Sequence, residues 1–335
     1  MRHITINQYG TFLGITSERL IIKQKDEVIK ELPLSRIRTI SITKKGISLS
    51  VDLIHACAIR GIRIFFLDWK DRIISAVMGQ NQHAVVSLRK AQFEAIKNEF
   101  LSCELSKKII ITKIKNQHAV IMYFTKNTVK NSPFYQSIIN NYNYIINNIK
   151  TIIQKLIPQN DSDSSWKNKL MGLEGKAATE YWHTLIKLNL LPDDFTNRET
   201  RFTESITNKA LNYGYAILLS KIWAAIDNTG MESYAGLLHT DRPGKPSLVL
   251  DLMEEYRAWL VDRTIIKLRN QIGDCKTLDM NLKKIINDEI HKTLITKYTF
   301  HKKRIKLENI IQRQAFRFAG ALTGKKKYKG YSFKW

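Results

Sequence analysis

The spacing of hydrophobic residues changes character near residue 85 of this chain. Before that point, short β-branched and aromatic runs are separated by glycine and proline, which is typical of strands joined by turns. One segment among them, SVDLIHACAIR at residues 50–60, predicts a helix instead. The runs that predict strands are residues 3–6, 19–23, 37–42 and 63–66.

From residue 86 onward the hydrophobic residues recur every three or four positions, which predicts α-helix almost throughout. The expected fold class is therefore α+β, with a small β-rich domain at residues 1–85 followed by a larger all-α domain at residues 86–335. The segments with the clearest helical pattern are residues 86–115, 118–157 and 205–227, of which the last is apolar nearly all round and so predicts a buried helix.

Residues 233–257 combine a turn-rich loop with a helical segment. The loop carries His239, and the helix is expected to begin near Ser247 as its N-cap. Asp251 and Glu254 lie one helical turn apart, so their carboxylates project together, although Glu255 also lies one turn from Asp251. Carboxylate oxygens suit Mg²⁺ and Mn²⁺, and a nearby imidazole favours Mn²⁺. The pattern indicates a divalent-metal site, but a solvated acidic helix face would have the same spacing.

A second acid, Glu174, lies in a helical segment after the loop PQNDSDSS at residues 158–165. Small neighbours leave its carboxylate accessible and let another molecule approach the backbone closely. A close helix–helix contact beside an exposed acid would show the same pattern. The small neighbours are Gly172, Gly175, Ala177 and Ala178.

LMGLEGKAATEYW at residues 170–182 and GLLHTDRPGKPSLVLDLMEEYRAWLVDR at residues 236–263 resemble the CRISPR-associated integrases of spacer acquisition. The resemblance extends over most of the chain. It implies that Glu174, His239 and Glu254 are catalytic and together hold one Mg²⁺ or Mn²⁺ ion, with Asp251 orienting that set. The resemblance, and not the spacing, selects Glu254 over Glu255.

The resemblance also implies a function. An enzyme of this family would insert short DNA fragments into a CRISPR repeat array, as a 3′-hydroxyl attacks a phosphodiester. The first domain would be a β-sandwich that forms a homodimer, and a small adaptation protein would bridge two dimers. Double-stranded DNA, as fragment and as repeat, would be the substrate. Arg242 and Lys245, in the loop of His239, are expected to hold the DNA backbone.

The charge balance agrees with a nucleic-acid substrate. The chain has 54 basic and 30 acidic residues, a formal net charge of +24, which favours binding to a polyanion by release of counterions. Residues 297–335 carry twelve lysines and arginines against one acid. A helix is expected at residues 301–322. Lys303, Arg304, Arg313 and Arg317 are expected to contact DNA.

The final segment, GKKKYKGYSFKW, interleaves lysines with aromatic residues. Such rings stack on bases or cover an apolar patch, and a solvated end is the other interpretation. The three cysteines are far apart and form no CxxC pair, which fits a reducing cytoplasm. No signal peptide or membrane span is expected.

Three other functions stay open at this level. A metal-dependent nuclease would use water in place of the 3′-hydroxyl at an identical site. A transposon-type recombinase of the same fold would act without a CRISPR role. A DNA-binding module without catalytic activity would lack the acids or the histidine, and all of these residues are present.

Overall fold

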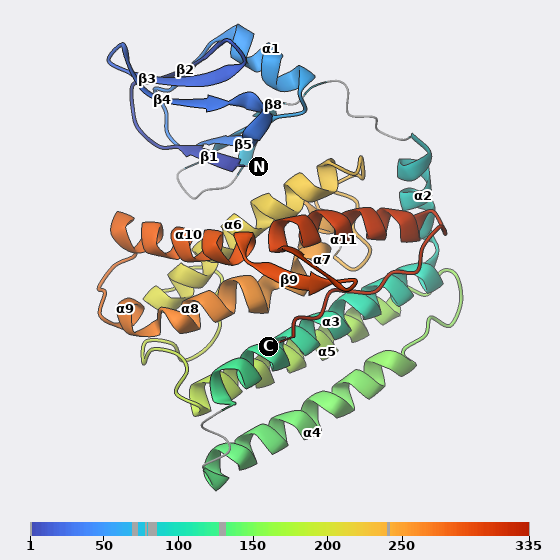
Figure 1. Cartoon of the computed structure of the whole chain (residues 1–335). Helices are drawn as coiled ribbons and strands as arrows, with labels where there is room; N and C mark the ends of the chain where they lie inside the picture. Colours follow the sequence, from blue (N-terminus) through green and yellow to red (C-terminus); the bar gives the residue numbers. More distant parts are fainter. Residues whose placement is uncertain are drawn as a thin grey trace. The chain divides into compact units, whose positions relative to one another are not determined.

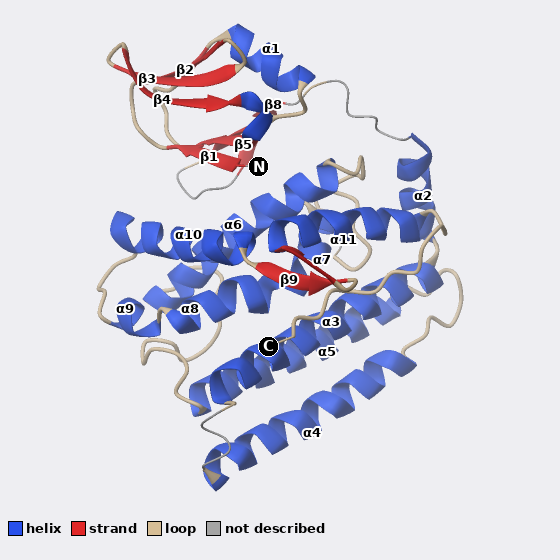
Figure 2. Cartoon of the chain, in the orientation of Figure 1, coloured by secondary structure: helices blue, strands red, loops and turns tan. Residues whose placement is uncertain are grey.

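The structure of this chain, a computed structural model, divides into two compact units, Met1–His83 and Ala84–Trp335 (Figure 1). The division lies close to the boundary expected at residue 85. Figure 2 shows strands gathered in the first unit and helices in the second, which confirms the expected α+β class. The residues that the structure describes are 2–68, 73–77, 79, 86–126, 132–239 and 242–334.

The strands of the first unit are β1 (Arg2–Ile6), β2 (Thr11–Thr16), β3 (Arg19–Gln24), β4 (Glu27–Pro33), β5 (Ile37–Ile42), β6 (Ser48–Leu49), β7 (Arg63–Leu67) and β8 (Ile73–Val77). They form two four-stranded sheets, ordered β1-β5-β7-β8 and β4-β3-β2-β6. In the first sheet β1, β5 and β7 are parallel, and in the second β2, β3 and β4 are antiparallel. Residues of both sheets and of helix α1 (Val51–Ile59), such as Leu13, Ile40 and Leu53, form one core.

Four strands match the sequence analysis, namely β1, β3, β5 and β7. The others were not expected, and β4 shows why. Its first five side chains are all exposed, so it has no alternation of buried and exposed positions, and its pairing with β3 is what defines it.

The second unit is mainly helical. The helices expected at residues 86–115 and 118–157 begin and end at other residues in the structure. Capping residues, and not the apolar spacing, set these ends. Asn98 begins the long helix α3 by accepting a hydrogen bond from the backbone N–H of Leu101 (2.9 Å), and Pro133 is the first residue of α4. The helices are α2 (Val86–Lys97), α3 (Glu99–Thr125), α4 (Pro133–Lys155), α5 (Ser165–Lys187), α6 (Ile206–Asp227), α7 (Ser247–Tyr256), α8 (Arg263–Lys267), α9 (Arg269–Gly273), α10 (Met280–Ile295) and α11 (Leu307–Leu322), with a π-helical turn η3 (Arg257–Asp262) after α7.

A β-hairpin precedes α11, so the expectations of an all-α domain and of a helix from residue 301 are wrong here. Strands β9 (Lys297–Phe300) and β10 (Lys303–Lys306) pair antiparallel around His301 and Lys302. Both turn residues have positive φ, which matches the right-handed twist of a two-residue hairpin. The apolar side chains of the hairpin, Tyr298, Phe300 and Ile305, recur with the two-residue period of strands and pack against the helical core.

Helix α3 occupies the centre of the second unit and contacts α5 on one side and α7 on another (Figure 1). It is enclosed to the point that polar residues such as Lys107, Lys113 and Asn116 are buried along it. The expected buried helix at residues 205–227 is α6, which packs against α7, α11 and η3. None of the described helices has the length and apolarity that a membrane span requires.

The contact between α6 and η3 leaves no room for a side chain at Gly214. A Cβ there would lie 2.6 Å from Cγ1 of Val261. We expect Gly214→Ala to lower the free energy of unfolding by about 1–3 kcal/mol through overpacking, although alanine favours helix by about 1 kcal/mol. Urea unfolding checks this, with Gly172→Ala on α5 as control. Nothing lies within 4 Å of a Cβ at Gly172, so that variant should be as stable as the wild type or more so. A Gly214→Ala protein as stable as Gly172→Ala would contradict the packing.

Candidate active site

Three helices that are distant in the sequence meet at the candidate site. Glu174 of α5 and Glu254 of α7 both face Lys113 of α3. The ammonium of Lys113 donates a hydrogen bond to Oε1 of Glu174 and lies 2.6 Å from Oε2 of Glu254. The side chains of Lys113 and Glu254 are only 10% and 6% exposed, so this pair is buried, whereas the side chain of Glu174 is 24% exposed. The structure thus brings two of the expected metal ligands to one shared cation.

Lys113 was not singled out from the sequence. It belongs to no motif, and it lies in a run in which Ile109, Ile110 and Ile114 are buried. The available signal was a lysine at a core position of an apolar helix. A lysine ammonium is almost never buried unless it is paired, so this position indicated a buried partner for it.

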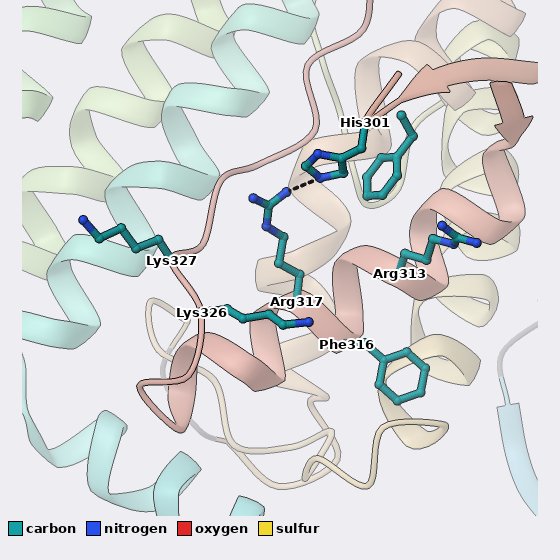
Figure 3. A pocket seen from close by; sticks show the side chains of 7 residues that line it. His301, Arg313, Phe316, Arg317, Lys326 and Lys327 are labelled. Carbon is teal, nitrogen blue, oxygen red and sulfur yellow. Dashed lines mark hydrogen bonds between the residues drawn. The ribbon is translucent and has the colours of Figure 1, made fainter. Parts of the chain in front are cut away.

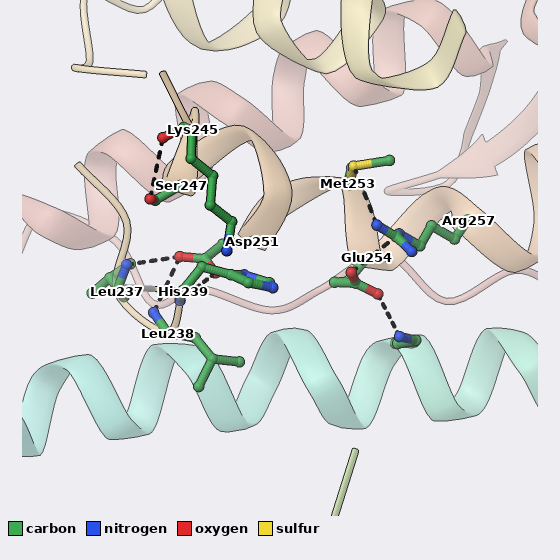
Figure 4. Close-up of polar contacts among 10 residues, drawn as sticks. Leu237, Leu238, His239, Lys245, Ser247, Asp251, Met253, Glu254 and Arg257 are labelled. Carbon is green, nitrogen blue, oxygen red and sulfur yellow. Dashed lines mark hydrogen bonds and ion pairs between the residues drawn. The ribbon is translucent and has the colours of Figure 1, made fainter. Parts of the chain in front are cut away.

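Arg257 provides a second cation beside Glu254 (Figure 4). Its Nε lies 3.1 Å from Oε1 of Glu254, and its Nη2 contacts Sδ of Met253 at 3.7 Å. Burial raises the pKa of Glu254, but the charges of Arg257 and Lys113 outweigh it and hold that pKa below its usual range. Burial likewise lowers the pKa of Lys113, and Glu254 and Glu174 outweigh it and raise that pKa. Glu254 and Glu174 therefore favour the charged form of Lys113 although Arg257 opposes it, and Arg257 and Lys113 favour the charged form of Glu254.

The geometry around Glu254 is that of ion pairs and not of hydrogen bonds. Its Oε2 and Nε of Arg257 are both buried without a hydrogen-bond partner of suitable angle among the described residues, despite their short distances to opposite charges. A carboxylate oxygen held in this way by charge alone retains lone pairs for another ligand.

His239 is oriented by Asp251 (Figure 4). Oδ1 of Asp251 lies 2.6 Å from Nδ1 of His239 and accepts from the backbone N–H of the same residue at 3.1 Å. Oδ2 accepts from the backbone N–H groups of Leu237 at 2.7 Å and Leu238 at 3.2 Å. Asp251 is buried, and these four contacts occupy its carboxylate. Because Nδ1 faces the carboxylate, Nε2 is the ring nitrogen left for a ligand.

The loop that carries His239 fits closely over the start of α7. A Cβ at Gly236 would lie 2.7 Å from Cβ of Ser247 and 2.9 Å from Oδ2 of Asp251, so a larger residue would push the loop off the carboxylate. The expectation that Ser247 is the N-cap is wrong by one residue. Pro246 is the cap and Ser247 begins the helix, where its side chain is buried. Backbone N–H groups of the loop therefore donate hydrogen bonds to the carboxylate of Asp251 near the start of α7, and no serine hydroxyl caps this helix.

Glu255, the other acid one turn from Asp251, points to a different partner. Its Oε1 accepts a hydrogen bond from the hydroxyl of Tyr328, and its Oε2 accepts from the backbone N–H of Tyr331 at 3.0 Å. Burial raises the pKa of Glu255 to about 7. The structure therefore separates two acids that the spacing left equivalent: Glu254 faces Lys113, and Glu255 holds the C-terminal segment.

The C-terminal segment is docked on the core through Tyr328 and Phe333, while its lysines are exposed. Phe333 is buried and stacks on Trp259, with ring centroids 4.9 Å apart. Its backbone N–H donates to Oδ1 of Asn116 at 2.9 Å, and Asn116 also donates to the carbonyl oxygens of Glu255 and Tyr331. Of the interpretations offered for its aromatic residues, cover of an apolar patch is the one that holds for Tyr328 and Phe333.

The donor set is compatible with a divalent ion. Two carboxylates already converge on one cation, and the Nδ1 of the His239 imidazole faces Asp251, which leaves Nε2 as the ring nitrogen that could bind a ligand. In the present arrangement, no three His, Cys, Asp or Glu side chains of the described residues are placed to hold a metal, and the ammonium of Lys113 lies between the two acids instead. The carboxylate oxygens of Glu174 and Glu254 and the imidazole of His239 are nonetheless of the kinds that suit Mg²⁺ and Mn²⁺.

The residues expected to contact DNA form two separate groups. Arg242 and Lys245 lie on the surface of the loop after His239, where the backbone N–H of Lys245 donates to the carbonyl of Arg242 at 3.0 Å. Residues 240 and 241 between them and His239 lie outside the described residues. The other group lies on the hairpin and on α11 and consists of Lys303, Arg304, Arg313 and Arg317.

Known proteins similar to this chain belong to one family. The family model described as "CRISPR associated protein Cas1" matches residues 4–299. The chain is 45% identical to the CRISPR-associated endonuclease Cas1 1 of Francisella tularensis subsp. novicida (strain U112), over 100% of both chains. It is 28% identical to the CRISPR-associated protein Cas1 3 of Methanobrevibacter ruminantium, over 99% of each.

Solved structures show the same fold. A casposase bound to its integration product superimposes with a TM-score of 0.79, at 24% identity, over 98% of this chain and 93% of that chain. A Cas1 protein from Thermotoga maritima gives a TM-score of 0.75, at 17% identity, over 99% of this chain and 100% of that chain. A Cas6-RT-Cas1–Cas2 complex gives 0.74, at 19% identity, over 100% of this chain and 36% of that chain. At these identities the likeness establishes the fold.

Replacement of Lys113 tests whether the site accepts a divalent ion. Lys113→Met removes the cation between the buried carboxylate of Glu254 and the partly exposed one of Glu174, which should cost about 3–5 kcal/mol of stability in the presence of a chelator. Mn²⁺ should restore most of that loss, because an ion that binds the native state stabilises it by mass action. Thermal unfolding across a Mn²⁺ titration measures both effects.

Lys115→Met is the matched control, since Lys115 lies on the same helix and is exposed. It should unfold like the wild type with or without Mn²⁺. If Mn²⁺ raises the Tm of Lys113→Met no more than that of the control, the carboxylate pair does not bind the ion.

Proposed function

The chain belongs to the CRISPR-associated Cas1 family, and we propose that it is a metal-dependent DNA integrase that inserts short DNA fragments into a CRISPR repeat array. The observation that carries the proposal is the convergence of Glu174 and Glu254, from separate helices, on one buried cation beside an oriented imidazole. The 45%-identical relative is named as an endonuclease, which agrees with phosphodiester chemistry at this site.

The reaction exchanges one phosphodiester for another. A 3′-hydroxyl of the fragment attacks a phosphorus of the repeat, the new P–O bond forms, and the old 3′-oxygen leaves with a proton. A divalent ion held by Glu174, Glu254 and His239 would polarise the phosphate and stabilise charge on the leaving oxygen. One ester replaces another, so no nucleotide cofactor is needed, and the sequence contains no GxxxxGK[ST] motif.

The chain's own side chains prepare this site. Asp251 fixes the ring of His239 so that Nε2 is presented, and the close fit at Gly236 keeps the loop on that carboxylate. Arg257 lies beside Glu254 and favours its ionised form. Arg242 and Lys245 would hold the DNA strand.

The family implies further partners. We propose double-stranded DNA as substrate, a homodimer formed through the first unit, and a small Cas2 protein that bridges two dimers in the cytoplasm. A net charge of +24 supports DNA binding. Among the similar solved structures are complexes described as Cas6-RT-Cas1–Cas2 and as a TtCas1–DNA complex.

Hydrolysis of DNA is the second candidate function. The 45%-identical relative is named as an endonuclease, which favours this function. Water and a 3′-hydroxyl are interchangeable as nucleophiles at a site of this kind. The likeness to a casposase bound to its integration product favours joining, and it also leaves a transposon-type recombinase as an alternative.

A joining assay with isosteric variants tests the proposed function. A labelled DNA fragment and a supercoiled plasmid that carries a CRISPR repeat are incubated with the chain, its Cas2 partner and Mn²⁺. Joined product indicates an integrase, and nicked plasmid without joined label indicates a nuclease. Glu174→Gln and Glu254→Gln should each lower joining by about 100-fold or more, which corresponds to roughly 2.7 kcal/mol in the barrier, while DNA binding by gel shift is retained.

Glu255→Gln is the matched control, because it makes the same chemical change one residue away on the other side of α7. Its amide can still accept from Tyr331 and donate to Tyr328, so joining should be close to that of the wild type. Equal losses in Glu254→Gln and Glu255→Gln would show that the changes act through α7 as a whole. Undiminished joining by Glu174→Gln would overturn the assigned site.

A further inference from the structure

A basic hollow lies on the second unit and shares no residue with the candidate active site (Figure 3). Its volume is about 540 Å³. Four of its lining side chains are cationic and two are phenylalanines, and none of the lining residues that the structure describes is acidic. The lining residues are Phe300, His301, Arg313, Phe316, Arg317, Lys326 and Lys327.

We propose that the basic hollow binds unpaired nucleotides of a DNA strand, away from the carboxylates that carry out joining. The proposal rests on the proposed function for the presence of DNA. It adds a second contact site to that function and specifies that this site takes single-stranded and not duplex DNA.

Two contacts inside the hollow position Arg317 and the backbone of Lys326 before any ligand arrives. Nη1 of Arg317 lies 2.8 Å from Nε2 of His301 at the tip of the hairpin (Figure 3). Lys326 extends across Gly320 of α11, where a Cβ would lie 3.2 Å from Cδ of the lysine. The backbone N–H of Lys326 donates to the carbonyl of Gly320 at 3.0 Å. A site preformed in this way loses less conformational entropy when a ligand binds.

The C-terminal segment that forms one wall is itself fixed. Tyr328 directly follows Lys327 and hydrogen-bonds Glu255 from a buried position. Farther along, Phe333 stacks on Trp259. The backbone that carries the two lysines of the wall is therefore anchored to the core through Tyr328 and Phe333.

The combination of groups selects the ligand. Arginine and lysine bind phosphate oxygens, and an aromatic ring binds the face of a base. Phe316 is 52% exposed between Arg313 and Arg317 on α11, so its ring is open to such a face. In a duplex each base is covered by its neighbours and presents only its edge in a groove. An exposed ring among cations therefore suits unpaired nucleotides better than duplex DNA.

Fluorescence anisotropy with the full chain in EDTA tests the proposal without any joining. The probes are a labelled oligothymidylate of about 15 nucleotides, the length that one or two single-strand sites cover, an abasic strand of the same length, and a duplex. Phe316→Leu should weaken binding of oligothymidylate by about fivefold or more and leave the abasic strand unchanged. Because Phe316 is exposed, this variant should fold normally, which circular dichroism checks.

Arg313→Ala/Arg317→Ala tests the phosphate contacts. It should weaken the binding of both single-stranded probes. It should also reduce the slope of log K against log salt by about 1.4, because two phosphate contacts are lost. The matched control, Lys276→Ala/Lys284→Ala, removes the same charge from exposed positions outside the hollow and should leave that slope within error of the wild type.

Three results would overturn the proposal: unchanged oligothymidylate binding by Phe316→Leu, an equal loss in the control pair, or a loss on duplex as large as on single strands. Failure of the joining assay leaves these measurements unaffected, since they contain no metal and no repeat plasmid. Conversely, if the chain joins DNA normally but Phe316→Leu binds oligothymidylate as tightly as the wild type, the proposed active site stands and only the proposed role of the hollow is overturned.

Discussion

The helical unit depends on the compensation of charge around the buried ion pair of Lys113 and Glu254. Lys113 and Arg257 face Glu174 and Glu254 at the junction of α3, α5 and α7. Removal of an ion from water costs several kcal/mol, so each of these side chains is tolerated because the others are present. The same four charges therefore hold three helices together and create a place where a cation is favoured. The contact that joins the three helices is therefore also the candidate active site.

The two neighbouring acids of α7 have different tasks. Glu254 belongs to the charge cluster, whereas Glu255 binds Tyr328 and the backbone of Tyr331. Through Glu255 the position of the C-terminal segment depends on the helix that carries the candidate metal ligand. That segment then provides Lys326 and Lys327 to the basic hollow. One helix thus organises both surfaces that are proposed to meet DNA.

Much of the fold was predictable because regular elements leave a periodic trace. The apolar stripe of α6 and the strands β5 and β7 were expected where they lie. The hairpin at residues 297–306 was missed because its apolar residues are few and lie among many cations, so a helix pattern that begins at Leu307 was extended too far. The break at Asn98 was missed because one side-chain cap, and no change in periodicity, ends one helix and starts the next.

The sequence by itself determined the α+β class and the excess of positive charge, and motif resemblance led to the prediction of Glu174, His239 and Glu254 as one site. Spacing left Glu254 and Glu255 equivalent, since both lie one turn from Asp251. Tertiary structure alone decided that Glu254 meets Lys113 and that Glu255 meets the C-terminal segment. The reason is that periodicity shows which residues share a face of a helix. What packs against that face depends on contacts between segments far apart in the chain.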